Sequence, residues 1–329
     1  MRVHGKWIGQ TGKTQAGEAI FSCLRGMLWE RGERMITIRD RIFRPPPESG
    51  SELLEIAVGC SYGACTFCQY SAGDIPLQVS PVDVICANLE ELSRTGSGKR
   101  RMFLTGGNVF AFKTEYLLTL FDLIKTYLPQ ITQLAMYARA DDVERKSDEQ
   151  LTALREAGLH TLYVGIESGN EQVLRMCRKN ETRQQMLQNL WRLDSFGIQY
   201  GLSSILGLGG RKLWQQHALD TASFYSAVTP ASIRVMTLNP IAGTPLARDI
   251  AAGRFQMPEP EDILREELLL LENIHYTGGS CRFVGNHHSN AIPLTGLLPA
   301  DREALLESLR QALKHKTAGS QDVIRMSDW

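Results

Sequence analysis

The sequence predicts an α/β protein built as a partial (βα)6 TIM-like barrel of parallel strands with a small C-terminal α/β extension. Between residues 53 and 238, six short apolar strand patterns alternate with helical patterns, which is typical of right-handed βαβ units around a parallel sheet. Six units are too few for the eight-stranded closed barrel. After residue 256 the alternation stops and the pattern changes. In both a partial barrel and a doubly wound sheet, functional residues belong at the carboxyl ends of the strands.

Residues 1–45 show no clear periodicity, and we expect an N-terminal extension that is disordered or follows from a start codon placed too far upstream. The segment Gly9–Thr14 resembles a phosphate-binding loop, but that loop needs Gly six residues before its Lys and position 7 is Trp. A stiff Arg44-Pro45-Pro46-Pro47 stretch ends the extension. The barrel is expected to occupy residues 46–256.

The six barrel strands are predicted from short runs rich in aliphatic and aromatic residues, each bounded by polar residues, Gly or Pro. They are Leu53–Val58, Met102–Leu104, Leu134–Tyr137, His160–Ile166, Tyr200–Leu206 and Ser232–Leu238.

The intervening helices are predicted from apolar residues at helical spacing and from their end signals, such as Ser80-Pro81 at one start and Gly158 and Gly197 at two ends. They are Val82–Leu92, Tyr116–Tyr127, Asp148–Glu156, Asn170–Arg178, Thr182–Ser195 and Leu213–Ala227.

Residues 257–329 are predicted to form an extension that covers the open mouth of the barrel. A helix is expected at Glu261–Ile274, a strand at Ser280–Val284 and a second helix at Asp301–Leu313. A six-unit barrel leaves one side open, and this segment is the sizeable piece of chain that follows the sixth strand.

Composition excludes several classes of protein. The 329 residues include 36 Lys and Arg and 36 Asp and Glu, so the formal net charge is zero and binding of nucleic acid by bulk electrostatics is not indicated. The longest apolar runs, such as Leu268–Leu271, are far too short to cross a membrane, and no secretory signal is visible. Seven cysteines in a chain of this length indicate a reduced, cytoplasmic protein with no membrane partner.

The strongest chemical signal is three cysteines within nine residues, Cys60, Cys65 and Cys68, directly after the first strand. Thiolates suit zinc or iron–sulfur clusters. A structural zinc site needs four protein ligands, and the next cysteine, Cys86, lies on the apolar face of a predicted helix. Three thiolates would leave one iron of a [4Fe–4S] cluster open to a small molecule. A zinc-binding or electron-transfer protein is the alternative, and it requires a fourth ligand.

This motif, together with four others in order along residues 43–290, resembles the radical S-adenosylmethionine (SAM) superfamily. The first Cys gap is four residues where most members have three, which is similar to an uncharacterised Elongator-protein-3-like branch that also carries the Arg44-Pro45-Pro46 pattern. The resemblance implies that the three cysteines hold a [4Fe–4S] cluster. It also implies that SAM is cleaved reductively and that hydrogen is abstracted from an unknown small or macromolecular substrate. A flavodoxin or ferredoxin system would supply the electron.

The resemblance also implies a set of SAM contacts. Phe67, before the third cysteine, would pack near the adenine, with plain core packing as the alternative. Gly106, Gly107 and Asn108 stand where the family has Gly-Gly-Glu, which holds the methionine amino group; an Asn there accepts hydrogen bonds without charge assistance. A simple turn is the alternative for these residues.

Three further motifs follow later strands. Arg139 would bind the methionine carboxylate, or else pair with Asp141 or Asp142 at the surface. Glu167 and Ser168 would contact the ribose hydroxyls, with helix capping as the alternative for Glu167. The glycine-rich Gly207 to Gly209 edge would let the backbone contact adenine.

Asn286, His287 and His288 are the candidate substrate contacts. They precede Pro293-Leu294-Thr295-Gly296, and the branch carries a similar Asn-His-x-Ser-Asn and Pro-Leu-x-Gly pair. Adjacent side chains on a strand point to opposite faces, so the two His are not expected to point the same way. A surface loop is the alternative. A methylthio-transfer enzyme would need a second Cys cluster, which the sequence lacks.

Overall fold

The protein is described by a computed structural model that covers residues 43–73, 75–96 and 98–317. The predicted N-terminal extension, residues 1–45, therefore lies outside the described residues except for its last three positions.

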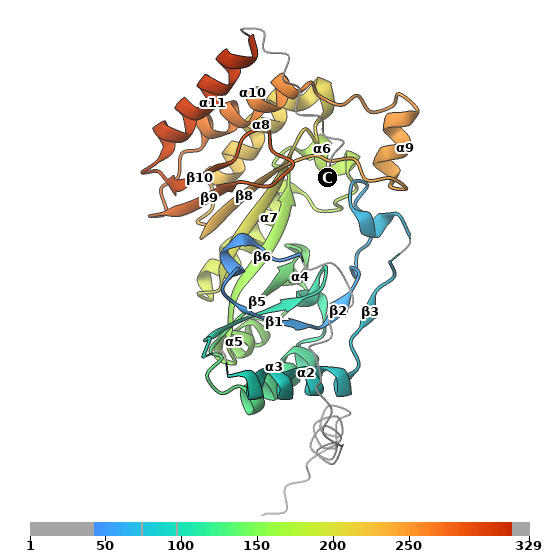
Figure 1. Ribbon diagram of the computed structural model, residues 1–329, viewed down its shortest axis with the longest axis vertical. Helices are drawn as coiled ribbons and strands as arrows, with labels where there is room; N and C mark the ends of the chain where they lie inside the picture. Colours follow the sequence, from blue (N-terminus) through green and yellow to red (C-terminus); the bar gives the residue numbers. More distant parts are fainter. Residues whose placement is uncertain (1–42, 74, 97, 318–329) are drawn as a thin grey trace, which may run out of the picture.

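One curved sheet of eight strands forms the centre of the molecule, in the order β1-β4-β5-β6-β7-β8-β9-β10 (Figure 1). Neighbouring strands are parallel from β1 to β9, and β10 returns antiparallel to β9. The edge strands β1 and β10 are not paired with each other, so the sheet is an open partial barrel and the predicted fold class is confirmed. The strands are β1 (Glu52–Glu55), β4 (Arg101–Thr105), β5 (Gln133–Ala138), β6 (Leu159–Glu167), β7 (Gln199–Leu206), β8 (Ser232–Thr237), β9 (Cys281–Gly285) and β10 (Leu294–Leu298).

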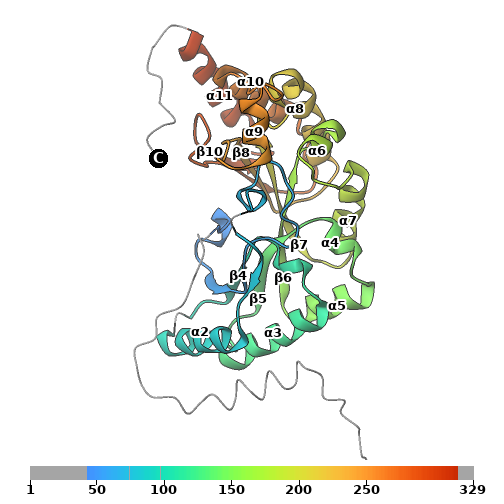
Figure 2. The same ribbon diagram turned by 90° about the vertical axis from the view of Figure 1, so that its right-hand side faces the viewer.

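Helices cover the convex side of the sheet and leave its concave side for the site (Figure 2). Capping boxes at Ser147 and Thr182 begin α5 and α7. The helices are α2 (Val82–Thr95), α3 (Thr114–Tyr127), α4 (Asp141–Glu144), α5 (Asp148–Glu156), α6 (Glu171–Met176), α7 (Arg183–Ser195), α8 (Gly210–Ser226), α9 (Pro245–Ala251), α10 (Pro260–Asn273) and α11 (Arg302–Thr317), with 3-10 turns η1 (Pro46–Glu48), η2 (Gln69–Ser71) and η3 (Val109–Ala111). No helix within the described ranges is both long and apolar enough to cross a membrane.

The first predicted strand is in fact two. The chain leaves the main sheet after β1, and β2 (Ala57–Val58) pairs antiparallel with β3 (Gln78–Val79). The turning point is Ile56, whose N–H still donates to Thr105 O at 3.0 Å while its carbonyl accepts from Ser80 N–H at 2.8 Å. The sequence pattern runs on through this change of partner, because the residues stay buried on both sides of it.

The C-terminal segment continues the sheet. Strand β9 is parallel to β8, with Ser232 opposite Arg282, and β10 forms a hairpin with it. The sequence analysis missed β10 because its residues alternate between buried and exposed over only five positions. The division into a barrel at 46–256 and an extension at 257–329 stays a prediction, and the sheet itself runs across that boundary.

A buried ion pair closes the amino-terminal end of the barrel interior. Glu48 is fully buried and accepts from Arg101 Nε at 2.8 Å and from the Tyr163 hydroxyl at 2.7 Å. Burial alone would raise the pKa of Glu48, but the hydrogen bonds from Arg101, Ser51 and Tyr163 hold it below its ordinary value. Above this pair, the rings of Phe103, Tyr137 and Tyr163 pack edge to face, with centroids 5.3 to 6.3 Å apart.

Replacing Glu48 tests how far the stability of the fold depends on the buried plug formed by Glu48, Arg101 and Tyr163. Glu48→Ala leaves the Arg101 guanidinium and the Tyr163 hydroxyl without their acceptor, so we expect the free energy of unfolding to fall by about 3–5 kcal/mol in urea titrations of the metal-free protein. Glu261→Ala removes an exposed partner of Arg265 on α10 and serves as the control, with an expected loss below about 0.5 kcal/mol. Equal losses in the two variants would contradict a structural role for the plug.

A second buried contact ties α10 to the end of β7. The Gly207 N–H donates to both oxygens of Glu266, at 3.1 and 3.0 Å, and Glu266 is fully buried. The neighbouring Glu267 is also buried, and its Oε1 has no hydrogen-bond partner among the described residues. Burial, together with the charge of Glu266, raises the pKa of Glu267 to about 8.

This shift makes stability depend on pH. The folded state holds the Glu267 proton up to about pH 8, while the unfolded state releases it near the ordinary Glu pKa of about 4.3, so stability falls as pH rises between these values. Glu267→Gln removes the effect. We expect its melting temperature to match wild type within about 1 °C at pH 4.5 and to exceed it by several degrees at pH 8. A difference that does not change with pH would refute the assignment.

Candidate functional site

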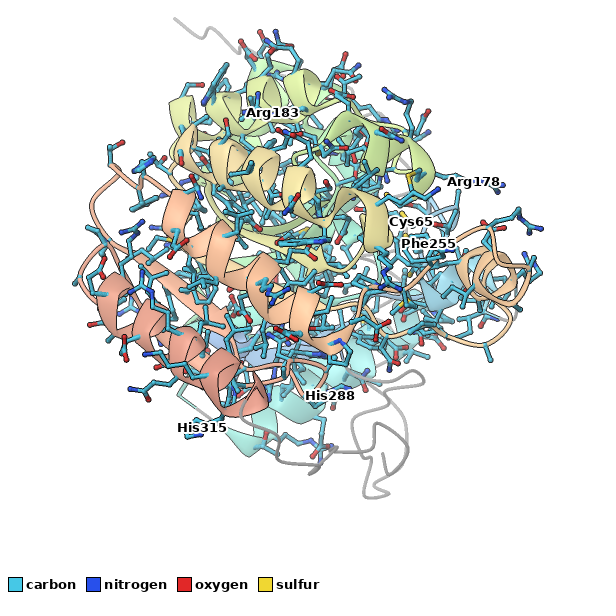
Figure 3. All side chains as sticks on the ribbon, turned by 90° about the horizontal axis from the view of Figure 1, so that it is seen from above. Cys65, Arg178, Arg183, Phe255, His288 and His315 are labelled. Carbon is cyan, nitrogen blue, oxygen red and sulfur yellow. The ribbon has the colours of Figure 1, made fainter. Side chains whose placement is uncertain are left out.

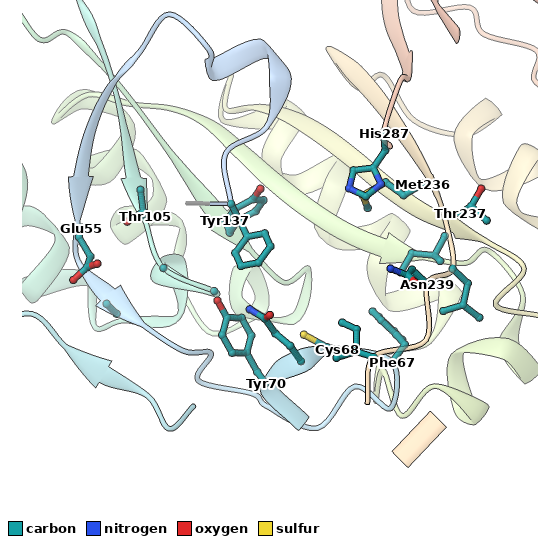
Figure 4. Close-up of a pocket in the computed structure, with 18 residues that line it drawn as sticks. Glu55, Phe67, Cys68, Tyr70, Thr105, Tyr137, Met236, Thr237, Asn239 and His287 are labelled. Carbon is teal, nitrogen blue, oxygen red and sulfur yellow. The ribbon is translucent and has the colours of Figure 1, made fainter. Parts of the chain in front are cut away.

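A cavity of about 340 Å³ opens at the carboxyl ends of the strands. Residues on five barrel strands, or just after them, form its wall, and the loop that carries the three cysteines forms its floor (Figure 4). The lining is mostly apolar and consists of Phe43, Glu55, Ala57, Phe67, Cys68, Gln69, Tyr70, Thr105, Gly106, Gly107, Tyr137, Ile205, Met236, Thr237, Leu238, Asn239, Ile241 and His287.

The cysteine loop runs between β2 and η2 and is held from two sides. Thr66 N–H donates to Cys177 O at the end of α6, and Thr66 O accepts from Leu246 N–H at the start of α9, both at 3.0 Å. Within the loop, Cys68 N–H donates to Cys65 O at 3.1 Å. The sequence analysis did not include Leu246 or α9, because these contacts join segments about 180 residues apart.

Cys60, Cys65 and Cys68 are free thiols, each partly exposed, and Cys68 lines the cavity. Burial, with smaller effects from the neighbouring thiols Cys65 and Cys60, raises the pKa of Cys68 to about 12, so the three lie close enough to interact. In the part of the chain that the structure describes, no three Cys, His, Asp or Glu side chains gather closely enough to hold one metal ion. A [4Fe–4S] cluster is bound differently, because each thiolate ligates its own iron.

The glycine pair after β4 packs directly against this loop. Gly107 N–H donates to Gly59 O at 2.9 Å. A Cβ on Gly107 would lie 2.6 Å from Gly59 O and 2.8 Å from the Cys60 Cβ, and a Cβ on Gly106, whose φ is +149°, would lie 2.7 Å from Val109 Cγ2. Only glycines let the two loops approach this closely. Both glycines line the cavity, as a contact to a bound cofactor requires.

Asn108 points away from the cavity. It is buried, and its Nδ2 donates to the Ser61 Oγ at 3.1 Å, so it fixes the start of the cysteine loop. Its Oδ1 is buried without a hydrogen-bond partner among the described residues, and the contact to a methionine amino group, inferred from the resemblance, stays a prediction. The structure gives Asn108 a positioning role.

Arg139 is occupied by partners from its own chain. Its Nε donates to Asp141 Oδ1 at 2.9 Å, its Nη2 lies 3.1 Å from Glu181 Oε2, and its guanidinium stacks 3.7 Å from the centroid of the Tyr62 ring. The pairing with Asp141, which the sequence analysis held open, is therefore present. Arg139 braces the cysteine loop through Tyr62 and does not line the cavity.

Glu167 and Ser168 end β6 beside this ion pair network. Glu167 has a φ of +64°, and its Oε1 lies 3.7 Å from Lys179 Nζ. Burial raises the pKa of Glu167, and the charge of Lys179 acts in the opposite direction. Ser168 is fully buried and accepts from Asn170 N–H at 2.9 Å, so its hydroxyl is used by the turn that begins α6. Neither residue lines the cavity.

The glycine-rich edge after β7 is covered by protein. Gly207 N–H is bound by Glu266, and a Cβ there would lie 2.8 Å from Ile263 Cδ1 of α10. Gly209 packs against His217 and Leu213 of α8. Neither glycine lines the cavity, since α10 packs over Gly207 and α8 over Gly209, and the adenine contact inferred for them stays a prediction. Phe67 lines the cavity, as a contact to adenine requires. It also packs on a core that includes Val173 and Ile205, as the alternative of plain core packing requires.

The three candidate substrate contacts Asn286, His287 and His288 differ in their position relative to the cavity. His287 lines the cavity, whereas Asn286 and His288 are exposed and do not. Figure 3 shows His288 well away from Cys65. The two His rings do lie together, with centroids 4.0 Å apart, because the segment is a turn and the strand rule for adjacent side chains does not apply.

Asn290 holds this turn in place. Its Nδ2 donates to Val235 O and Gly285 O at 3.0 and 2.9 Å, and its Oδ1 accepts from Thr237 N–H at 2.7 Å. The sequence analysis quoted Asn290 within a motif without giving it a role. It also missed the cavity residues Glu55, Tyr137 and Met236, which sit on inward-facing strand positions that an alternation count could have found.

Residues 54–222, just over half of the chain, match the sequence profile of the Radical SAM superfamily. The chain belongs to this superfamily. Radical SAM enzymes use a [4Fe–4S] cluster and SAM, so the predicted enzyme class and the two predicted cofactors are confirmed at the level of the family. Such enzymes need a reductant. The residues that contact each cofactor remain predictions.

Two curated proteins show how broad the similarity is. The chain is 25% identical over 166 residues to the heme chaperone HemW of Bacillus subtilis, which covers 48% of this chain and 43% of HemW. It is 30% identical over 185 residues to the tRNA-2-methylthio-N(6)-dimethylallyladenosine synthase of Hahella chejuensis, covering 52% of this chain and 40% of the synthase. The matched regions thus span less than half the length of either relative.

Among solved structures, the Elp3 protein of the archaeon Methanocaldococcus infernus with an N-terminal deletion superimposes with a TM-score of 0.50. The match covers 81% of this chain and 64% of that one at 12% sequence identity. Identity this low shows a shared fold alone. Membership of the Elongator-protein-3-like branch therefore stays a prediction.

Gly107→Ala tests the packing of the two loops. The added methyl group meets backbone at Gly59 and forces the cysteine loop to move, so we expect a loss of about 1–3 kcal/mol in the free energy of unfolding and a lower iron content after anaerobic reconstitution. Gly50→Ala is the matched control, because no atom lies within 4 Å of the new methyl group. Wild-type iron content in Gly107→Ala would show that the loops do not depend on this contact.

Proposed function

We propose that this chain is a radical SAM enzyme in which Cys60, Cys65 and Cys68 ligate the [4Fe–4S] cluster and SAM binds in the adjoining cavity. The observation that carries the proposal is a loop with three free thiols, of which Cys68 lines a cavity of about 340 Å³ that Gly106 and Gly107 also line. Three protein thiolates leave one iron open for the amino and carboxylate groups of SAM.

A [4Fe–4S] cluster held by Cys60, Cys65 and Cys68 would, when reduced, supply the electron for cleavage of the SAM sulfonium to methionine and a 5′-deoxyadenosyl radical. The residues of the chain bind and orient SAM and the substrate, and they exclude water from the cavity. Its glycine backbone fits a ligand at close range, and the ring of Phe67 offers a flat apolar surface for a base. The apolar lining keeps solvent from a reactive intermediate.

Several residues act on the site from outside the cavity. Asn108 holds Ser61, and Arg139 stacks on Tyr62, so both fix the backbone that carries the first cysteine. The substrate occupies the part of the cavity that His287 and Met236 line and donates a hydrogen atom there. A flavodoxin or ferredoxin supplies the electron at the partly exposed cysteine loop. The structural zinc alternative requires four ligands around one ion, and the described residues offer it no specific support.

The experiment is anaerobic reconstitution with iron and sulfide, followed by reduction in the presence of SAM. We expect about four irons and four sulfides per chain and the release of 5′-deoxyadenosine and methionine. Replacing Cys60, Cys65 and Cys68 together by Ala should abolish both signals. Cys281→Ala, which alters a buried thiol on β9, should keep them. Stoichiometric zinc with no SAM cleavage in the wild-type protein would refute the proposal.

A further inference from the structure

Arg234 on β8 is a half-buried arginine that has no ionic partner within the described ranges. It lies two residues before Met236, which lines the cavity, so both side chains project from the concave face of the sheet, while Ile233 and Val235 between and beside them are buried in the core. Among the residues that the structure describes, no carboxylate lies within ion-pair distance of it. Its Nη1 is buried and has no hydrogen-bond partner in the same part of the chain.

Two other arginines of the barrel interior, by contrast, have ionic partners. Arg101 is bound by Glu48, and Arg139 by Asp141 and Glu181. A guanidinium removed from water without an acceptor costs free energy, because its five donors lose their hydrogen bonds to water. Burial accordingly lowers the pKa of Arg234, although the group stays charged. Arg234 does not itself line the cavity, but it lies close enough to His287 and Tyr137, which do, to interact with both electrostatically. An uncompensated cation beside a cavity is typical of a ligand site.

Two cavity residues face the same region with donor groups. His287 Nδ1 accepts from Ser289 N–H at 3.3 Å and lies 2.7 Å from the Ser289 Oγ, which leaves the proton on Nε2, the nitrogen not used by the turn. Burial, with smaller effects from His288 and Arg234, lowers the pKa of His287 to about 4, so the imidazole is neutral at pH 7. Tyr137 lines the cavity from β5, and its phenol interacts electrostatically with Arg234.

The set of donors formed by Arg234, His287 and Tyr137 lies apart from the proposed SAM position. Figure 4 shows His287 and Met236 across the cavity from Glu55 and Thr105. Gly106 and Gly107, the proposed SAM contacts, follow Thr105 directly. The register partner of Arg234 on β7 is the small Ser203, so no bulky neighbour fills the space beside the guanidinium on that strand.

We propose that Arg234, assisted by His287 and Tyr137, binds an anionic group of the substrate, a carboxylate or a phosphate, while the apolar part of the substrate fills the cavity. The planar guanidinium can bind either oxyanion through two parallel hydrogen bonds, and the neighbouring imidazole and phenol each add one donor. This inference rests on the proposed function, since it names the substrate class of that site. It also explains why the chain keeps an unpaired arginine in the barrel.

The test measures binding of three probes to the reconstituted full chain: phenylacetate, phenylphosphonate and the neutral phenylacetamide. We expect at least one anion to bind the wild-type protein about tenfold or more tightly than the amide, and the stronger anion identifies carboxylate or phosphate. Arg234→Gln should remove this preference. Arg234→Lys should retain only part of it, because a point charge lacks the bidentate fork. Arg265→Gln removes the same charge from exposed α10 and should change nothing.

Stability separates a binding role from a structural one. Arg234→Met removes an unpaired cation and should raise the melting temperature by about 2–4 °C while abolishing the preference for anions. A lower melting temperature in Arg234→Met, or unchanged anion binding in Arg234→Gln, would overturn the proposal.

Measuring SAM binding, and SAM cleavage in the absence of substrate, distinguishes a substrate contact of Arg234 from a SAM contact. We expect both to stay within about twofold of wild type in Arg234→Gln, and a tenfold loss of SAM affinity would instead place the guanidinium on SAM and overturn the proposal. If the wild-type protein fails to cleave SAM, the proposed function fails, whereas the anion preference of Arg234 is still decided by the probes.

Discussion

The site depends on one close contact between two loops. Gly107 N–H reaches Gly59 O at 2.9 Å, and neither loop has room there for a side chain on Gly107. Because Gly59 precedes Cys60, this contact fixes where the cysteine loop begins relative to the end of β4. Asn108 strengthens the same junction through Ser61. The cavity floor is therefore set by backbone geometry, which tolerates less variation than side-chain packing does.

The barrel interior is graded from one end to the other. A saturated ion pair of Glu48 and Arg101 fills the amino-terminal end, and a layer of edge-to-face aromatic rings lies above it. The cavity occupies the carboxyl-terminal end, and Arg234, which has no ionic partner among the described residues, lies on β8 two residues before Met236 of its lining. Stability and chemistry are thus separated along the barrel axis, as is usual for folds of this kind. Arg234 Nη1 is one of several buried polar atoms without a hydrogen-bond partner in the described residues, which also include Glu267 Oε1 and Arg139 Nη1.

The sequence was sufficient to predict the six parallel strands, because each is a short apolar run that stays buried whatever it pairs with. It also predicted the superfamily, since the cysteine spacing is local. It could not predict that Glu266 of α10 would take the N–H of Gly207, nor that Glu181 would join Asp141 as a partner of Arg139. Those contacts join residues up to 59 positions apart and depend on tertiary packing. Arg234 was missed for the same reason, because only the fold shows that no acid faces it.

The anchoring of the β9–β10 turn has a consequence for how the cavity is entered. Three hydrogen bonds of Asn290 attach the turn that carries His287 to the end of β8, so that wall moves as one rigid body with the sheet. The opposite wall is different, because the β2–β3 ribbon is only two residue pairs long and Val79 on it is exposed. Local opening is easiest where the fewest bonds must break, which makes the ribbon side the natural gate for a substrate too large to diffuse in through a fixed mouth.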